Sequence, residues 1–447
     1  MNNTTPQIEI YGAGLAGCEA AFQAVRYGVH VRLYEIKPKM RTPAHNSDNF
    51  AELVCSNSFR SAKISNAVGL LKEELRRMGS LIIEAADATA VPAGSALAVD
   101  RTQFSEYITN KIRNCDKIEI INEEVTQINK KSICIVATGP LTTEPFSAYI
   151  MNMLGSESLH FFDAAAPIVD FSSINMEKAF FASRYDKGEA SYINCPMSKE
   201  EYDCFYDALV NARVAELKDF DREAQKDMKV FEGCMPIEVM AKRGYDTLRF
   251  GPLKPVGLVD PKTGKEAFAV VQLRQDNSDR TMYNMVGFQT NLAFEEQRRV
   301  FRLIPGLESA EFLRYGVMHR NTYINSPELL TLYYTLRTAP NVFFAGQITG
   351  VEGYVESTSS GLVAGINAAR CALGLPLVDF TRETVTGALA HYISLGGSGS
   401  FQPMNANFGI VSPLGYKVRG GKTAKNEAIA QRALDAIDRV STQIQLK

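Results

Sequence analysis

Several features that would direct a protein to a membrane, out of the cell or onto nucleic acid are missing from this sequence of 447 residues. No stretch approaches the roughly 20 consecutive apolar residues of a membrane-spanning helix. Lys and Arg number 48 against 50 Asp and Glu, which excludes a globally basic nucleic-acid binder but leaves room for a local basic surface. The opening MNNTTPQIEIYG lacks the basic and apolar segments of a secretory signal, so we expect a cytoplasmic protein with no membrane partner.

The eight cysteines follow neither a metal-binding nor a disulfide pattern. No CxxC pair occurs, and Cys195 and Cys204 lie outside the usual spacing of zinc ligands. A disulfide framework is not expected in a long chain without a secretory signal. We therefore predict reduced thiols and no metal, with most thiols buried and inert and one or two available for chemistry.

A glycine motif near the start predicts a dinucleotide site. The run IEIYGAGLAGCEAAFQAVRYGVHVRLYE places Gly12, Gly14 and Gly17 between a strand and a helix, and a second strand ends at Glu35. The first glycine permits a tight turn, the second lets the backbone approach a pyrophosphate, and the third allows helix and strand to pack closely. Glu35 is placed to accept hydrogen bonds from a ribose, and the helix N-terminus favours the phosphates. The residues predicted to bind the cofactor in this run are Gly12, Ala13, Gly14, Leu15, Ala16, Gly17 and Glu35.

Two later segments favour FAD over NAD. SICIVATGP (132–140) is an apolar strand ending in Ala-Thr-Gly, and NVFFAGQITG (341–350) enters a glycine-rich turn before a helix with small residues along one face. A late strand, turn and helix that return to the nucleotide are the flavoprotein arrangement, so we predict contacts to FAD from Gly139, Gly346 and Gly361. The alternative is an unrelated contact between helix and sheet. Since no second GxGxxG occurs, a nicotinamide donor, NADPH or NADH, would bind transiently.

The middle of the chain shows a different pattern of apolar and polar residues. Runs such as EAFAVVQLRQD alternate as strands do, and SKEEYDCFYDALVNARVAEL is typical of a helix. The chain also exceeds the size at which one hydrophobic core stops growing. We predict an α/β fold: a Rossmann-like, two-dinucleotide-type FAD-binding domain in residues 1–175 and 316–447, with a C-terminal helix, interrupted by an α+β insertion domain in residues 176–315.

Further runs, spread to about residue 409, resemble one family closely: TPAHNSDNFAELVCSNSFRS, ALAVDR, DAAAPIV, SRYDKGEA, FEGCMPIEVMAKRG, FGPLKPVGL, GVMHRN, AGQITGVEGYVES and FQPMNANFG. They are similar to the folate- and FAD-dependent tRNA (uracil-5-)-methyltransferases. The resemblance implies 5-methyluridine formation in the T-loop of tRNA (U54). The carbon would come from 5,10-methylenetetrahydrofolate and the electrons from FADH2, itself reduced by NAD(P)H. Ribosomal RNA remains an alternative target within the same chemistry.

The chemistry of this reaction needs two protein groups. A thiolate added to C6 of uracil makes C5 nucleophilic, and a base must later remove the C5 proton. The resemblance supplies two cysteines at matching positions, Cys55 and Cys234. We predict that Cys234 attacks C6, because Lys242 and Arg243 follow it, and that Cys55 accepts the proton or guards the flavin; the roles could be exchanged. Taken without the resemblance, either cysteine would be a buried, inert thiol.

Other residues are candidates for substrate contacts. His319 and Arg320 suit a folate carboxylate or an RNA phosphate, although a structural pair is an equal alternative. Tyr354 could stack on the pterin or flavin ring or simply pack. His45 is more typical of a hydrogen-bonding residue than of a base.

Four basic runs offer a local surface for RNA, although each singly is more typical of a solvated face. They are KEELRR (72–77), MAKRG (240–244), EEQRRV (295–300) and GYKVRGGKTAK (415–425). The competing functions are a flavin oxidoreductase acting on a small molecule and an RNA-binding protein in which FAD is only structural.

Overall fold

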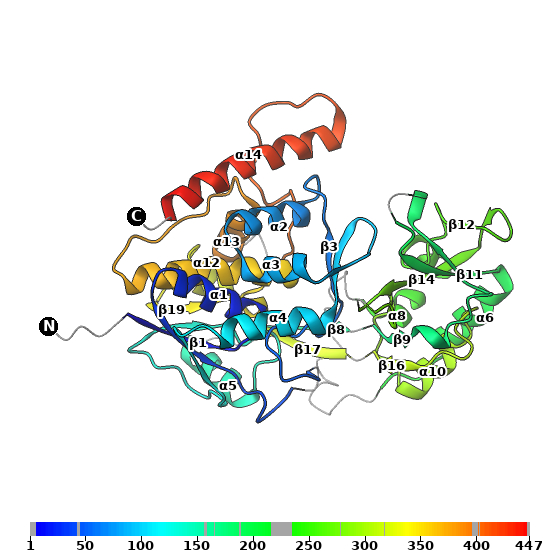
Figure 1. The fold of residues 1–447 in the computed structure, drawn as a ribbon, viewed down its shortest axis with the longest axis horizontal. Helices are drawn as coiled ribbons and strands as arrows, with labels where there is room; N and C mark the ends of the chain where they lie inside the picture. Colours follow the sequence, from blue (N-terminus) through cyan, green and yellow to red (C-terminus); the bar gives the residue numbers. More distant parts are fainter. Residues whose placement is uncertain are drawn as a thin grey trace.

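The computed structural model of the protein describes residues 6–42, 45–155, 159–164, 166–186, 189–215, 235–277, 279–316, 318–395, 401 and 403–444. Figure 1 shows two lobes, a larger one that contains both ends of the described chain and a smaller one built from the middle of the sequence. Among the described helices, none combines the length and the apolar character that crossing a membrane requires.

A six-stranded sheet forms the centre of the larger lobe. Five neighbouring strands run parallel, and β18 is added antiparallel at one edge. The central strands read as short apolar runs because both of their faces are covered. In spatial order the strands are β18 (Thr335–Leu336), β19 (Ala339–Phe344), β7 (Ile133–Val136), β1 (Gln7–Tyr11), β2 (His30–Tyr34) and β6 (Ile118–Ile121).

Two helices with small residues pack tightly on this sheet. They are α1 (Leu15–Arg26) and α12 (Tyr354–Ala372). A Cβ atom added at Gly361 would lie 2.3 Å from the Ala16 carbonyl oxygen, and one at Gly365 would lie 2.6 Å from Ala20 Cα. The small residues on this face of α12 therefore allow α12 to approach α1 closely.

Further helices and a small sheet complete the larger lobe. In Figure 1, α14 is the outermost helix and lies beyond α2 and α13. These elements are α2 (Ala67–Arg77), α3 (Leu81–Ala88), α4 (Arg101–Arg113), α5 (Glu144–Leu154), α11 (Ser326–Leu329), α13 (Val385–Leu395), α14 (Gly421–Ile444), and the sheet of β3 (Ser58–Ser61), β5 (Ala96–Val99) and β4 (Ala90–Val91).

The smaller lobe is a second six-stranded sheet, in which all the neighbouring strands are antiparallel. It has a separate hydrophobic core drawn from residues 166–312. Its strands in spatial order are β10 (Phe180–Ala182), β11 (Tyr192–Met197), β14 (Ala269–Gln275), β15 (Met282–Met285), β9 (Ile168–Asp170) and β16 (Phe312–Arg314). With it come α6 (Lys199–Val210), α8 (Ile237–Lys242), α9 (Thr247–Phe250), α10 (Phe294–Phe301) and the hairpin β12 (Val259–Asp260) and β13 (Lys265–Glu266).

The chain crosses between the lobes twice, through a two-stranded antiparallel ribbon. Its strands are β8 (Leu159–Ala164) and β17 (Met318–Tyr323), which lie between the lobes in Figure 1. This arrangement confirms the predicted fold class, a Rossmann-like α/β unit interrupted by an α+β insertion. The second sheet already includes β9, ahead of residue 176, and ends with β16, before residue 315. The domain limits at 175/176 and 315/316 stay a prediction.

Candidate active site

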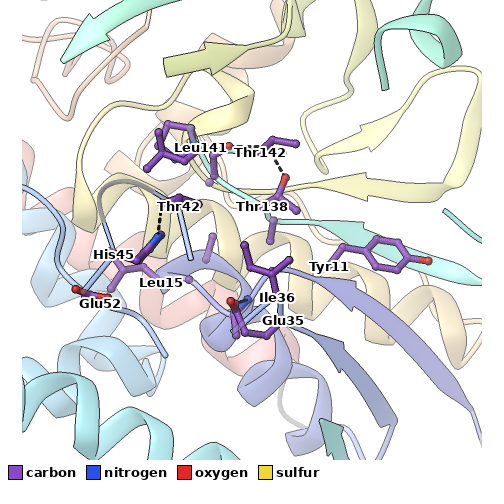
Figure 2. Close-up of a pocket in the computed structure, with 18 of the residues that line it drawn as sticks. Tyr11, Leu15, Glu35, Ile36, Thr42, His45, Glu52, Thr138, Leu141 and Thr142 are labelled. Carbon is purple, nitrogen blue, oxygen red and sulfur yellow. Dashed lines mark hydrogen bonds between the residues drawn. The ribbon is translucent and has the colours of Figure 1, made fainter. Parts of the chain in front are cut away.

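A cavity opens at the carboxyl ends of β1, β2 and β7, with about 1120 Å³ of space not filled by protein atoms, part of which is open to solvent. The chain runs from β1 to β2 on one side and later returns to β7 on the other, so the strand order reverses between β1 and β7. Ligands of open α/β sheets bind at this kind of reversal. In Figure 2, His45 and Glu52 lie on one side of the cavity, and Leu141 and Thr142 lie at its top.

The glycine loop between β1 and α1 forms the floor of the cavity. Gly12 has a φ of +104°, and a Cβ atom there would lie 2.6 Å from the Ala137 carbonyl oxygen. A Cβ atom at Gly17 would lie 1.8 Å from the Gly12 carbonyl oxygen, so this glycine is needed for packing. Gly14 is the N-cap of α1, and no atom lies within 4 Å of the position of an added Cβ. The loop therefore leaves room for a ligand at Gly14, where the backbone N–H groups of the helix start are available.

Glu35 lies in the cavity wall directly after β2 and is 8% exposed. Its carboxylate accepts the Ala13 N–H at 2.9 Å and the Lys37 N–H at 3.1 Å. A carboxylate has lone pairs for about four hydrogen bonds, so Glu35 retains capacity for a ligand hydroxyl. It also holds the glycine loop, a role that the sequence did not suggest.

The remaining predicted cofactor residues separate into two groups. Ala13, Leu15, Ala16, Gly139 and Gly346 line the cavity together with Gly12, Gly14 and Glu35. Gly139 has a φ of +70° and open space beside it, and a Cβ atom at Gly346 would lie 3.1 Å from that of Ala16. Gly17 and Gly361 instead sit in backbone contacts with Gly12 and Ala16. The structure thus gives these two glycines a packing role behind the cavity.

His45 lines the cavity and makes the hydrogen bond that its sequence context indicated. Its Nδ1 lies 2.6 Å from Thr42 Oγ1 (Figure 2). Burial lowers the pKa of His45, and the charge of Lys37 lowers it further. Next to it, Glu52 accepts the Asn46 N–H at 2.8 Å. These contacts make His45 a neutral hydrogen-bonding residue near pH 7.

Cys55 lies in the loop 53–57, beside the cavity. The side chains of Glu52, Val54 and Tyr354 line the cavity, and the Cys55 N–H donates to Tyr354 Oη at 2.8 Å. The Tyr354 ring also packs against Phe59, with 5.8 Å between ring centroids. Tyr354 is therefore both a packed aromatic and part of the cavity wall, which brings the two predicted residues Cys55 and Tyr354 together.

Three arginines hold this loop, and sequence reasoning missed all of them. Arg101 starts α4, Arg274 lies in β14, and Arg314 ends β16. One signal was present, since Arg274 directly follows the mostly apolar run AFAVVQL, and a charge inside a buried strand needs a partner.

Other predicted positions fall partly outside the described residues. Cys234 lies outside the described residues. The next residue, Met235, is buried, and Glu238 in α8 accepts the Asn291 N–H at 2.8 Å. The backbones of His319 and Arg320 belong to β17, opposite Asp163 and Phe162 of β8. Their side chains are not among the described ones.

The first basic run, 72–77, serves the fold. Lys72 is buried and donates to the carbonyls of Phe59 and Ser61. Arg76 pairs with Glu73 and Asp87, and Arg77 pairs with Glu73 and Asp438. This run is a structural anchor and a neutralised surface. In the described part of the chain, no cluster of three or more His, Cys, Asp or Glu side chains could hold a metal ion.

Known proteins resemble this chain along nearly its whole length. Residues 7–376 match the family described as "GIDA: Glucose inhibited division protein A". The chain is 62% identical over 427 residues to "Methylenetetrahydrofolate--tRNA-(uracil-5-)-methyltransferase TrmFO" of Acetivibrio thermocellus, covering 96% of this chain and 97% of that protein. It is 57% identical over 432 residues to the protein of the same name in Brevibacillus brevis, covering 97% of each.

A solved structure shares the fold. Aquifex aeolicus GidA, in its form II crystal, has a TM-score of 0.70 and 17% identity, over 100% of this chain and 75% of that chain. At this identity the likeness concerns the fold alone. With the family match over residues 7–376 and the 62% identity to a relative of almost the same length, the resemblance seen in the sequence motifs is confirmed. The chain therefore belongs to the GIDA family, among its methylenetetrahydrofolate–tRNA-(uracil-5-)-methyltransferases.

Proposed function

We propose that this protein methylates C5 of a uridine in the T-loop of tRNA (U54). The carbon comes from 5,10-methylenetetrahydrofolate and the reducing equivalents from FADH2, which NADPH or NADH regenerates. The observation that carries this proposal is the identity of 62% over 96% of the chain to a relative whose name states folate, tRNA and uracil-5-methylation.

The cavity supports the cofactor part of the proposal. The space beside Gly14 and the open positive-φ turn at Gly139 suit a ligand that approaches the backbone closely. Thr143 Oγ1, in the cavity wall, is buried without a hydrogen-bond partner among the described groups. A buried polar atom of this kind is available to hydrogen-bond a ligand in the cavity. FAD would be held by the glycine loop, Glu35 and the turns at Gly139 and Gly346, and it supplies the electrons that reduce the transferred carbon.

The two cysteines divide the remaining chemistry. In the proposal, the thiolate of Cys234 adds to C6 of the uracil, which makes C5 a nucleophile for the incoming carbon. Cys55, beside the cavity, accepts the C5 proton afterwards. Tyr354 supports this assignment because its ring forms part of the cavity wall and its hydroxyl positions the Cys55 backbone. His319 and Arg320 remain proposed contacts to folate or to an RNA phosphate.

The proposal is tested with purified protein, [methylene-¹⁴C]tetrahydrofolate, NADPH and two RNAs, a T-loop minihelix and ribosomal RNA. We expect label in the minihelix as 5-methyluridine. Label found only in ribosomal RNA would show that the proposed reaction is right but that its target is ribosomal RNA. No transfer to either RNA would refute the methyltransferase assignment. A protein that purifies without flavin absorbance and does not take up added FAD would contradict the cofactor proposal.

Cysteine variants test the assignment of residues. Cys55→Ala and Cys234→Ala should each retain FAD and lose methyl transfer by at least about 100-fold, the usual scale for a general base or a nucleophile. Cys115→Ala is the matched control, since Cys115 is also half-buried but precedes β6 on the outer part of the sheet. A Cys55→Ala enzyme that transfers methyl at the wild-type rate would return Cys55 to a packing role.

A further inference from the structure

The loop that carries Cys55 lies where the two lobes meet. Asn57 Nδ2 donates to the Val99 carbonyl at 2.8 Å in the larger lobe and to the Gln275 carbonyl at 3.0 Å in the smaller lobe. The geometry around Cys55 therefore depends on both lobes.

Guanidinium groups reach this loop from both sides. Arg101, from the larger lobe, donates to the Leu53 carbonyl and, at 3.4 Å, to the Cys55 carbonyl. Arg314, from the smaller lobe, donates to the Val54 carbonyl. The three residues up to and including Cys55 are thus fixed through their backbone oxygens.

Arg274 holds the other side of the cysteine. Its Nη2 donates to Ser56 Oγ at 2.6 Å and its Nε donates to Asn57 Oδ1 at 3.1 Å. Together, Arg101, Arg274 and Arg314 contact every residue from Leu53 to Asn57. We call these three residues the arginine cradle.

The cradle is largely buried, with Arg274 buried and Arg101 and Arg314 of intermediate exposure, and it carries more charge than its carboxylates neutralise. Arg101 is paired at 3.1 Å with Asp276, which is fully buried, and Arg274 is 8% exposed. Burial lowers the pKa of Arg274 and of Arg314, and the charge of Arg101 lowers both further, whereas Cys55 raises both. Buried like charges without matching counter-charges are costly, so the cradle favours a nearby anion.

The other ionisable groups around the loop leave this excess in place. Glu52 faces Arg314, but it also lies 4.0 Å from Lys37 Nζ. Among the described residues, the three arginines and Lys37 are four cations, and Asp276, Glu52 and Glu35 are three carboxylates, which leaves one positive charge in excess. His45 stays neutral because burial and Lys37 lower its pKa. Tyr354 contributes a hydroxyl that accepts the Cys55 N–H.

We propose that the arginine cradle holds Cys55 as a thiolate near neutral pH, so that Arg101, Arg274 and Arg314 act as positioning residues for the proton acceptor. This inference rests on the proposed function for its place in the reaction. The C5–H bond breaks and its proton goes to the Cys55 sulfur. The electron pair forms the C5–C6 double bond, the C6–S bond to Cys234 breaks, and the Cys234 thiolate leaves. Cys55 ends as a thiol and returns its proton to solvent.

The ionisation of the Cys55 thiol is measured on the folded flavoprotein without RNA or folate. Iodoacetamide alkylates a thiolate with loss of iodide, and peptide mass spectrometry follows Cys55 as a function of pH. We expect a midpoint about one pH unit or more below the ordinary thiol value of about 8.5. The difference in ultraviolet thiolate absorbance between the wild type and Cys55→Ser gives the same midpoint. This second measurement does not require a reagent to reach the thiol. A midpoint at or above the ordinary value overturns the proposal, whatever the methyl-transfer assay shows.

Variants of the cradle separate charge from packing. Arg314→Gln and Arg101→Gln should each raise the Cys55 midpoint by about one pH unit, whereas Arg314→Lys should raise it less because it keeps the charge. The matched control is Arg302→Gln, since Arg302 also donates to a backbone carbonyl of the smaller lobe, that of Ala310. Variants that retain FAD and fold but keep the wild-type midpoint would reduce the cradle to a packing device.

Discussion

The glycine loop and the cysteine loop border the same cavity, but different forces hold them. The glycine loop 12–17 takes its shape from steric contacts: a Cβ atom at Gly17 would meet the Gly12 carbonyl of the same loop, and one at Gly12 would meet the Ala137 carbonyl at the end of the neighbouring strand. The cysteine loop 53–57 is held by arginines that lie 46 to 260 positions away along the chain. The glycine loop thus depends on a contact within the loop and on the neighbouring strand of the same sheet, whereas the surroundings of Cys55 depend on the assembly of both lobes.

The largest effect is expected from breaking the glycine loop. Gly17→Ala would put a Cβ atom 1.8 Å from the Gly12 carbonyl oxygen, so a fixed backbone would have to move. We expect destabilisation at or beyond the upper end of the roughly 1–3 kcal/mol typical of overpacking, together with loss of FAD, measured by thermal unfolding and flavin absorbance. Gly14→Ala is the matched control: it should fold with normal stability and weaken only FAD binding. Equal stability of the two variants would contradict local specification of this loop.

The next effect concerns the counter-charge of the cysteine loop. Asp276→Asn leaves Arg101 buried without its carboxylate, which should cost about 3 kcal/mol of unfolding free energy in urea denaturation. Because it also increases the excess positive charge, it should lower the Cys55 alkylation midpoint further. A higher midpoint would contradict the electrostatic account of the cradle.

A smaller effect should depend on pH through Lys72, which anchors the strand leaving the cysteine loop. Burial lowers the pKa of Lys72 to about 7, and the charge of Arg60 contributes. The unfolded chain keeps the ordinary lysine pKa near 10.4 and therefore binds more protons between pH 7 and 10. The contribution of neutral Lys72 to the unfolding free energy is complete above the unfolded pKa of about 10.4. It is lost progressively as the pH falls from there to the folded pKa of about 7.

The measurement is the unfolding free energy of the wild type and of Lys72→Met across this range. The wild-type value should rise more steeply with pH, by less than the limit of about 1.4 kcal/mol per pH unit for one proton. Parallel curves for the two proteins would show that Lys72 does not titrate in this window.

The smallest effect is expected at the hydrogen bond from the Cys55 N–H to Tyr354, a residue of the cavity wall. Tyr354→Phe removes the hydroxyl that accepts the Cys55 N–H but keeps the ring, so it should cost about 1 kcal/mol. Hydrogen exchange at the Cys55 amide should accelerate while FAD binding stays unchanged. Unchanged exchange would mean that the arginine cradle alone fixes the loop.

Sequence reasoning succeeded where the physics is local. The turn at Gly12 and the packing role of Gly17 followed from spacing, because a strand, a turn and a helix in succession allow few arrangements, while the approach of a pyrophosphate at Gly14 stays a prediction. Gly361 was assigned to the cofactor, but the structure uses it to bring α12 against α1. A small residue on a buried helix serves either purpose, and only the position of the partner helix distinguishes them.

The surroundings of Cys55 were not accessible in the same way. The resemblance, and not the spacing, singled out this cysteine, and nothing in residues 51–60 indicates the arginines that hold it. The basic run 72–77 offered a surface for RNA or a solvated face, and in the structure Lys72 donates to the carbonyls of Phe59 and Ser61 while Arg76 pairs with nearby carboxylates. Charge in a sequence does not reveal its partners.

By itself, the sequence determined the Rossmann-like start, the cavity-forming glycines, the interrupted arrangement of two units and the family to which the chain belongs. Only the tertiary structure decided that the cysteine loop sits between Arg101 of one lobe and Arg274 and Arg314 of the other. The physical reason is range: the positive φ at Gly12 and the contact of Gly17 with the Gly12 carbonyl involve a few consecutive residues of one strand, turn and helix. Electrostatic surroundings arise only when distant segments meet and water is excluded.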